Sequence, residues 1–269
     1  MSAFFIGICV PRSGETMEKK FPEHMVPLED KMFSFSCHSG LSCFTTCCRN
    51  VEMYLFPYDI LRLKNAIGVD SEQFLRDRTC LIKGANPYFP SVIMKLLDDE
   101  SKTCRFLTRE GCSVYTDRPS SCRTYPLERA VDRDPGRKKV QDYYFMTNHP
   151  YCHGHKENRL FGVKEWIRNQ KLDEFNMMND LWAEIDSIFM TNPWKGEGSG
   201  GPKQQLAFMV CYNIDAFRRY SSVNNILEQF RLSKDQKKRI ETDDSELLKF
   251  GFQWLKLLLT GTSNLMIRR

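Results

Sequence analysis

The chain lacks any long hydrophobic run. Its longest strongly apolar stretch, WLKLLLTG at residues 254–261, is far shorter than the roughly 20 residues that a membrane-spanning helix needs. The first residues, MSAFFIGICV, also lack the basic n-region and the A-x-A-like cleavage site of a signal peptide. We therefore expect a cytoplasmic protein that has no membrane contact.

An excess of charge of one sign is absent as well. The chain carries 39 Lys and Arg against 34 Asp and Glu, a formal net charge of +5, and it contains no internal repeat or low-complexity tract. The basic residues do not form a stripe with interleaved aromatic residues, which is the pattern of a nucleic-acid interface. We therefore do not expect nucleic acid as a partner.

Cysteine, in contrast, is abundant: the chain has 11, roughly twice the ordinary usage for its length. Reducing conditions in the cytosol disfavour structural disulfides, so metal or redox chemistry is the natural explanation. Eight of the 11 lie within residues 37–122, and Cys152 follows closely. We expect Cys9, Cys80 and Cys211, in contrast, to be core packing, because free cysteine is often buried.

The clustered thiols predict a metal site. Soft thiolate sulfur selects zinc, copper(I) or iron–sulfur clusters over magnesium or calcium, and eight thiols match two four-ligand sites in number. Cys47 and Cys48 would point to opposite sides of an extended segment, so they would serve two centres, unless one of them is structural. A redox-sensing dithiol at this pair is disfavoured because a disulfide between neighbours is strained. The candidate ligands are Cys37, Cys43, Cys47, Cys48, Cys104, Cys112, Cys122 and Cys152.

Polar side chains beside the cysteines leave two interpretations open. Arg118 and Arg123 could hydrogen-bond the sulfur of a cluster, or they could form salt bridges with Asp117 or Glu128. Three histidines next to candidate ligands either bind metal or lie in solvent-facing turns: His38, His153 and His155.

The periodicity of the sequence predicts an α+β protein. An irregular leader at residues 1–30 precedes a small, loop-rich cysteine-cluster metal-binding domain with short strands and helices at residues 31–160. Residues 161–269 form a helical C-terminal region, with Trp166 and Trp182 in its core. This helical region is the expected surface for an unidentified protein partner.

Local signals place the ligands on short elements. Pro57 opens a helix that Gly68 closes, and Ser71 caps a second helix. A hairpin at residues 104–115 holds Cys104 and Cys112 near its ends, and Cys122 lies on one helical turn within residues 118–126. Further strands are expected at residues 51–55, 91–99 and 137–147, and further helices at 171–190, 203–220, 222–230 and 243–259, with a flexible break at 192–202.

Three stretches, FSCHSGLSCFTTCC, PYDILRLK and CRFLTREGCSVYTDRPSSCRTYPL, resemble the YkgJ-type cysteine-cluster family, which is described as a zinc- or iron-chelating domain. The resemblance covers about residues 31–160. The first stretch departs from the commonest family spacing, C-x2-C-x2-C-C, because five residues separate Cys37 from Cys43 and three separate Cys43 from Cys47. That longer first gap is similar to the one in flagellin lysine N-methylases, which are associated with an iron–sulfur cluster. The best ligand candidates that this resemblance implies are Cys37, Cys47, Cys48, Cys104, Cys112 and Cys122.

Three functions follow from these observations. The first is a metal-binding protein that holds an iron–sulfur cluster, of the four-iron four-sulfur type, or iron, with a redox or catalytic role. The second is a structural zinc module for protein binding. The third is a lysine-methylase-like modifying enzyme, although the chain lacks a glycine-rich S-adenosylmethionine loop and a C-x3-C-x2-C radical motif. That enzyme would need a pocket, with Tyr54, Tyr58, Asp59 and Tyr115 as candidate lining residues.

Overall fold

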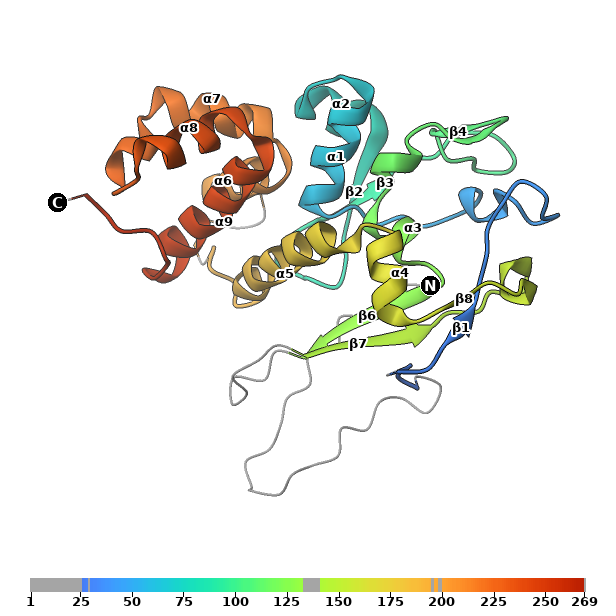
Figure 1. Ribbon diagram of the computed structural model, residues 1–269. Coiled ribbons are helices and arrows are strands. Elements are labelled where there is room, and N and C mark those ends of the chain that lie inside the picture. The colour runs from blue at the N-terminus through green and yellow to red at the C-terminus, as the bar shows by residue number, and fades with distance from the viewer. Residues whose placement is uncertain (1–25, 29, 133–140, 195, 198–199, 269) are drawn as a thin grey trace.

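The computed structural model describes residues 26–28, 30–132, 141–194, 196–197 and 200–268 of the 269-residue chain. Short antiparallel strand pairs and helices alternate up to residue 161, and the chain from 163 to 260 is largely helical (Figure 1). The predicted α+β class is therefore confirmed. The predicted leader lies almost entirely outside the described residues.

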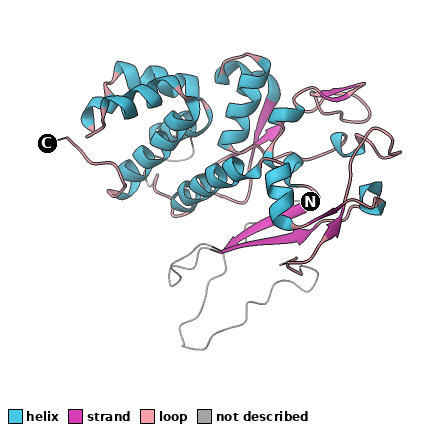
Figure 2. Cartoon of the chain, in the orientation of Figure 1, coloured by secondary structure: helices cyan, strands magenta, loops and turns pink. Residues whose placement is uncertain are grey.

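The strands of the described chain form four separate two-stranded antiparallel ribbons. Loops and helices connect these short ribbons (Figure 2). The ribbons are β1 (Phe33–Ser34) with β8 (Leu160–Phe161), β2 (Thr79–Ile82) with β3 (Ser91–Met94), β4 (Leu107–Thr108) with β5 (Gly111–Cys112), and β6 (Leu127–Asp132) with β7 (Gln141–Met146).

The helices are short in the first half of the chain and longer in the second. They are α1 (Pro57–Ile67), α2 (Ser71–Arg78), α3 (Ser120–Thr124), α4 (Val163–Asn169), α5 (Leu172–Phe189), α6 (Pro202–Tyr212), α7 (Ile214–Val223), α8 (Lys234–Thr242) and α9 (Asp244–Thr260). None of these helices is both long enough and apolar enough to cross a bilayer.

Capping residues explain where the first two helices begin and end. Pro57 is the first residue of α1, and Gly68 ends it with a left-handed φ of 70°. The predicted cap of α2 is wrong by one residue, because the Asp70 side chain accepts from Gln73 N at 2.7 Å. Ser71 instead donates its hydroxyl to Asn213 Oδ1 at 2.7 Å, which ties α2 to the start of α7.

The C-terminal helices differ from the prediction at one asparagine. The single helix expected at 203–220 is wrong, because Asn213 ends α6 and its side chain caps α7 by accepting from Ala216 N. The helix expected at 222–230 is also wrong: α7 ends at Val223 and a 3-10 turn occupies Ile226–Gln229. Helix α8 was not predicted, and a capping box between Ser233 and Gln236 is the signal for it.

The strands predicted at 91–99 and 137–147 are present but shorter, and the strand predicted at 51–55 is wrong. β3 ends at Met94, and residues 51–55 contribute only an isolated bridge from Tyr54 to Ile93. β7 begins at Gln141, and residues 137–140 of the predicted strand lie outside the described residues. The partners β2 and β6 were not predicted.

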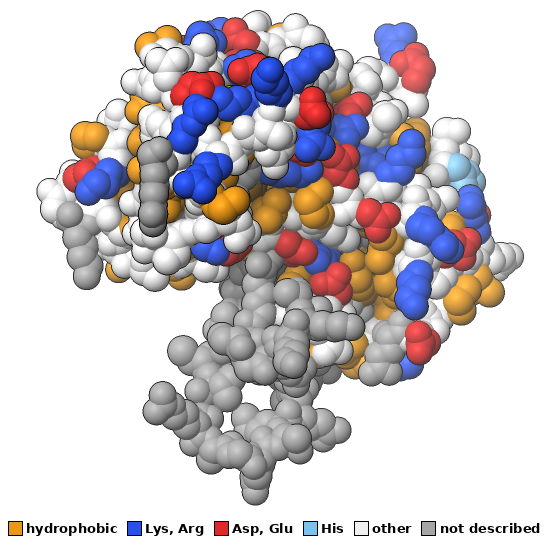
Figure 3. All heavy atoms as spheres, turned by 60° about the vertical axis from the view of Figure 1, so that its left-hand side comes forward, with side chains coloured by type: hydrophobic (Ala, Val, Ile, Leu, Met, Phe, Trp, Pro, Cys, Tyr) orange, Lys and Arg blue, Asp and Glu red, His pale blue; other side chains and the backbone are white. Residues whose placement is uncertain are grey.

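Two hydrophobic cores hold the molecule together. The larger core combines side chains of α1, α2 and β3 with those of α5–α9, so it joins segments on both sides of residue 160. Trp182 lies in this core and Trp166 in the other, as expected. The smaller core packs β1, β6, β7, β8 and α4 beside the loop that carries the first cysteines. Over the face formed mainly by the C-terminal helices, Lys and Arg side chains are interspersed with Asp and Glu (Figure 3).

Candidate metal centre

The eight candidate ligands lie on loops and very short elements around one region of the molecule. Cys37 and Cys43 belong to the loop after β1, and Cys47 and Cys48 belong to the 3-10 helix Thr46–Cys48. The remaining four follow in order: Cys104 in the loop before β4, Cys112 on β5, Cys122 on α3, and Cys152 directly before the 3-10 helix His153–Lys156. All ten cysteines of the described residues are free thiols.

Backbone hydrogen bonds bring these segments together. Cys104 N donates to Cys48 O at 2.8 Å, and Arg49 forms an isolated bridge with Thr103, so the hairpin segment lies along the 3-10 helix. On the other side, His153 N donates to Cys43 Sγ at 3.1 Å. The loop after β1 therefore contacts both the β4–β5 segment and the Cys152 segment.

The adjacent cysteines do not point to opposite sides. Because Thr46–Cys48 is a 3-10 helix and not an extended segment, the Cys47 and Cys48 side chains lie close enough to form a hydrogen bond. This bond lowers the pKa of Cys47 to about 7 and raises the pKa of Cys48. The expectation of opposite directions is wrong, and the pair instead provides one thiol that ionises readily near neutral pH.

The charge of Cys47 acts on thiols from every part of the cluster. Burial, followed by the charge of Cys47, raises the pKa of Cys37 to about 11. Burial, followed by the charge of Cys47, raises the pKa of Cys104. Burial, followed by the charges of Cys104 and Cys47, raises the pKa of Cys112. Burial of its sulfur, followed by the charges of neighbouring thiols, raises the pKa of Cys122, although the residue as a whole is exposed.

These interactions divide the other thiols into two groups around Cys47. Most of these thiols interact electrostatically with Cys47 and with other members of their own group. Cys43 and Cys152 belong to their group through their interactions with Cys37. One group holds Cys37, Cys43 and Cys152, and the other holds Cys48, Cys104, Cys112 and Cys122.

Within the described part of the chain, no group of three or more His, Cys, Asp or Glu side chains is arranged so that it could hold a metal ion. The donor chemistry nevertheless fits zinc or iron, because free, mutually interacting thiols are the ligands that these metals take in four-thiolate sites. Binding would deprotonate them and draw them closer, as metal binding commonly does.

A buried carboxylate positions Cys122. The Asp59 side chain is fully buried and accepts from Phe56 N at 2.9 Å, from Ser120 N at 2.8 Å and from Ser120 Oγ at 3.1 Å. It thereby joins the first turn of α1 to the first turn of α3. Burial raises the pKa of Asp59 to about 6. The Cys122 thiol, two residues after Ser120, lies 3.9 Å from Met53 Sδ.

The salt bridges predicted for the two arginines beside Cys122 are wrong, and their hydrogen bonds to the sulfur of a cluster stay a prediction. Arg118 donates to Tyr115 O at 2.6 Å and to Gln170 Oε1, and Arg123 donates to Gln170 O at 2.6 Å. Asp117 pairs with Arg62 instead. Burial, followed by the positive charges of Arg118 and Arg62, lowers the pKa of Arg123 to about 10. Both arginines therefore bind backbone and amide oxygen and not a carboxylate.

The predicted histidines all have protein partners for a ring nitrogen. His155 lies between Phe35 and Tyr125 in an aromatic cluster, and the other two bind polar side chains. The pairs are His38 Nε2 with Glu157 Oε2 at 3.3 Å, His153 Nδ1 with Ser42 Oγ at 2.9 Å, and His155 Nε2 with Tyr125 OH at 3.1 Å. Their role as ligands stays a prediction.

The other three cysteines have different environments. Cys211 is buried in the larger core, as predicted. Cys80 is exposed on β2, so its prediction as core packing is wrong: strand β2 turns this side chain toward solvent. Cys9 lies outside the described residues.

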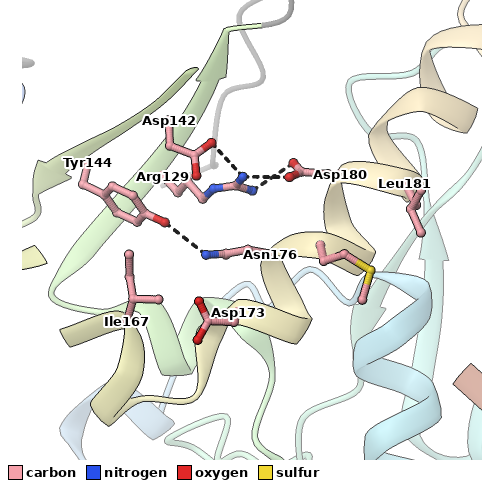
Figure 4. Close-up of a pocket in the computed structure, with 9 residues that line it drawn as sticks. Arg129, Asp142, Tyr144, Ile167, Asp173, Asn176, Asp180 and Leu181 are labelled. Carbon is pink, nitrogen blue, oxygen red and sulfur yellow. Dashed lines mark hydrogen bonds and ion pairs between the residues drawn. The ribbon is translucent and has the colours of Figure 1, made fainter. Parts of the chain in front are cut away.

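A cavity of about 410 Å³ lies between the β6–β7 ribbon and helix α5 (Figure 4). In it Arg129 donates to Asp142 at 2.8 Å and to both oxygens of Asp180, and Asn176 donates to Tyr144 OH at 3.0 Å. None of the cysteines lines this cavity. The residues predicted to line an enzyme pocket lie elsewhere: Tyr58 and Asp59 are buried, Tyr115 is exposed, and Tyr54 bridges to β3.

Comparison with known families gives one match, and it covers the cysteine region. Residues 36–153 match the family CxxCxxCC, described as "Putative zinc- or iron-chelating domain". All eight candidate ligands fall inside the matched range, and the match supports a metal-binding function for this segment. No curated protein and no solved structure matches the chain. The similarity to flagellin lysine N-methylases stays a prediction.

Proposed function

We propose that the cysteine-cluster domain holds iron, as an iron–sulfur cluster or as iron alone, and that this centre has a redox or catalytic role. The observation that supports the proposal is that hydrogen bonds join the separate segments that carry these eight free thiols. Electrostatic interactions among several of these thiols support it as well.

The two thiol groups suggest how the ligands would be divided. Cys48, Cys104, Cys112 and Cys122 would supply one four-thiolate centre, and the remaining four thiols, which include Cys47, would supply a second. A four-thiolate set suits an iron–sulfur cluster, and such a cluster supplies one-electron redox chemistry when it is bound. The low pKa of Cys47 supports its use as an early ligand, because the thiolate is the form that binds metal.

A structural zinc site is the alternative, and one observation favours it. The strands nearest the cysteines, β1, β4, β5 and β8, are two residues long, so this part of the domain has little regular structure to hold it. Zinc in such a site would contribute folding free energy directly. The lysine-modifying enzyme receives less support, because none of its predicted pocket residues lines the cavity between β6–β7 and α5.

Anaerobic purification, followed by an absorbance spectrum and by iron, zinc and acid-labile sulfide analysis of one sample, tests the proposal. An iron–sulfur centre predicts a broad band near 400 nm with iron and sulfide in similar amounts. Colourless protein with stoichiometric zinc would contradict the iron proposal and favour the structural site. Metal-free protein from every preparation would contradict both.

A further inference from the structure

A methionine sulfur lies beside one of the candidate cysteine ligands. The Cys122 thiol donates to Met53 Sδ, and the two sulfur atoms are 3.9 Å apart. Two sulfur atoms bound to one metal ion, each at about 2.3 Å and with a tetrahedral angle between the bonds, would be about 3.8 Å apart. The two sulfurs therefore already have the separation of two ligands on one metal ion, and the thiol proton lies between them.

Backbone pairing holds Met53 in this position. Its carbonyl accepts from Met94 N at 2.8 Å, and Leu55 N donates to Val92 O at 2.8 Å, so the segment runs along β3. Side chains two residues apart in an extended segment share a face, so Met53 lies on the side of Leu55, which is buried in the larger core. Met53 itself packs against that core as a partly buried residue, and its side chain is therefore fixed on one side of its segment.

A buried carboxylate holds Cys122 against the same segment. Asp59 accepts from Phe56 N at 2.9 Å, three residues after Met53. It also accepts from Ser120 N at 2.8 Å, two residues before Cys122. The contact between the two sulfurs therefore joins two segments that separate hydrogen bonds already bring together. Because Cys122 is exposed, a metal ion can reach it from solvent.

Thioether and thiolate sulfur together favour a soft metal ion. Cu(I) accepts both kinds of sulfur, whereas zinc sites are built from cysteine, histidine and carboxylate ligands. We propose that Met53 Sδ and Cys122 Sγ are two ligands of a Cu(I) site, which a further thiol of the group that contains Cys122 completes. When Cu(I) binds, it replaces the Cys122 thiol proton, which passes to the solvent.

This inference rests on the proposed metal-binding function and names a metal that the same thiols would take in addition to iron. Cys104 N donates to Cys48 O at 2.8 Å, and the thiols of both residues interact electrostatically with Cys122. These two thiols are therefore the candidates for the third ligand. Leucine would fill the space of Met53 as well as methionine does, so a test must isolate the sulfur atom.

The measurement is the Cu(I) and the Zn²⁺ affinity of the full-length protein under anaerobic conditions, by competition with a chromogenic chelator for each metal. We expect Met53→Leu to weaken Cu(I) binding by tenfold or more, because loss of even an outer hydrogen-bond partner costs a metal site about 10- to 100-fold in affinity. The same variant should bind Zn²⁺ like the wild type, since zinc does not use the thioether. Met178→Leu, in the same core on α5, is the matched control and should bind both metals like the wild type.

X-ray absorption at the copper edge tests the bond itself, in protein that is labelled with selenomethionine and loaded with Cu(I). A bond from Met53 to copper predicts a directly bound selenium atom, which Met53→Leu removes and Met178→Leu retains. Copper bound to sulfur alone, equal Cu(I) affinity of the two variants, or a wild type that binds Zn²⁺ or iron but not Cu(I) would overturn the inference while leaving metal binding intact. Failure of the wild type to bind any of the three metals would instead refute the proposed function.

Discussion

Replacing Asp59 by alanine should weaken both the fold and the metal site. The carboxylate is fully buried and accepts three hydrogen bonds, one from Phe56 N and two from Ser120. Asp59→Ala leaves these three donors without an acceptor in the core. At about 1 kcal/mol for each buried donor, the free energy of unfolding should fall by about 3 kcal/mol.

Urea unfolding of the apoprotein at pH 7 measures this loss. Ser120→Ala, which removes one of the three hydrogen bonds, should cost about 1 kcal/mol. Asp98→Ala is the matched control, because this exposed carboxylate pairs only with Lys102 at the surface, and its curve should coincide with that of the wild type. In Asp59→Ala the metal-to-protein ratio should fall too, since α3 then loses its attachment to α1.

The reasoning would be refuted if Asp59→Ala unfolded at the same urea concentration as Asp98→Ala. A stability loss with unchanged metal content would be a narrower failure. It would show that Asp59 supports the fold and has no part in placing Cys122.

Three further predictions concern charge, thiols and pH. Lys64→Met, which removes a buried cation from between two carboxylates of α7 and α9, should lower the free energy of unfolding by about 3 kcal/mol in urea titrations, whereas Lys102→Met should change nothing. Cys122→Ser should lower the metal-to-protein ratio measured by elemental analysis, and Cys80→Ser, on the exposed face of β2, should leave that ratio at the wild-type value. Burial raises the pKa of Asp59 from 3.8 to about 6, so the folded protein holds this proton more tightly than the unfolded chain. The stability that this proton provides is complete below pH 3.8 and is lost as the pH rises through 6. Asp59→Asn should therefore flatten the pH dependence of the urea midpoint over that interval, and an unchanged slope would contradict the predicted pKa.

Signals carried by neighbouring residues were sufficient for much of the fold. Pro57 and Gly68 set the ends of α1, and the turn after β4 placed the hairpin, because these conformations depend on a few adjacent residues. Asn213 shows the limit of such signals. Apolar residues continue across it at helical spacing, and the chain nevertheless breaks there because the asparagine side chain caps the next helix.

The candidate cysteine ligands can be read from the sequence, but the side chains that surround them cannot. Gln170 receives hydrogen bonds from Arg118 and Arg123 across about fifty residues, and nothing in its local sequence indicates this. Asp59 was considered only as a pocket residue. Its place in the first turn of a helix opened by Pro57 was the available sign of a capping role.

The relation between Cys47 and Cys48 depended on one local conformation. An extended segment would separate the two thiols, whereas the 3-10 helix that the chain adopts brings them within hydrogen-bond distance. Short loop segments of this kind have no periodic signal, so their conformation follows from the contacts of the whole domain, here including the hydrogen bond from Cys104 N to Cys48 O.

X-ray absorption at the metal edge of anaerobically purified protein tests the central claim most directly, because it reports which atoms surround the metal. Binding by the clustered cysteines predicts a first shell of sulfur alone at about 2.3 Å, and an iron–sulfur cluster adds a shell of neighbouring iron atoms. A first shell of nitrogen and oxygen at about 2.1 Å would contradict the claim that these thiols hold the metal.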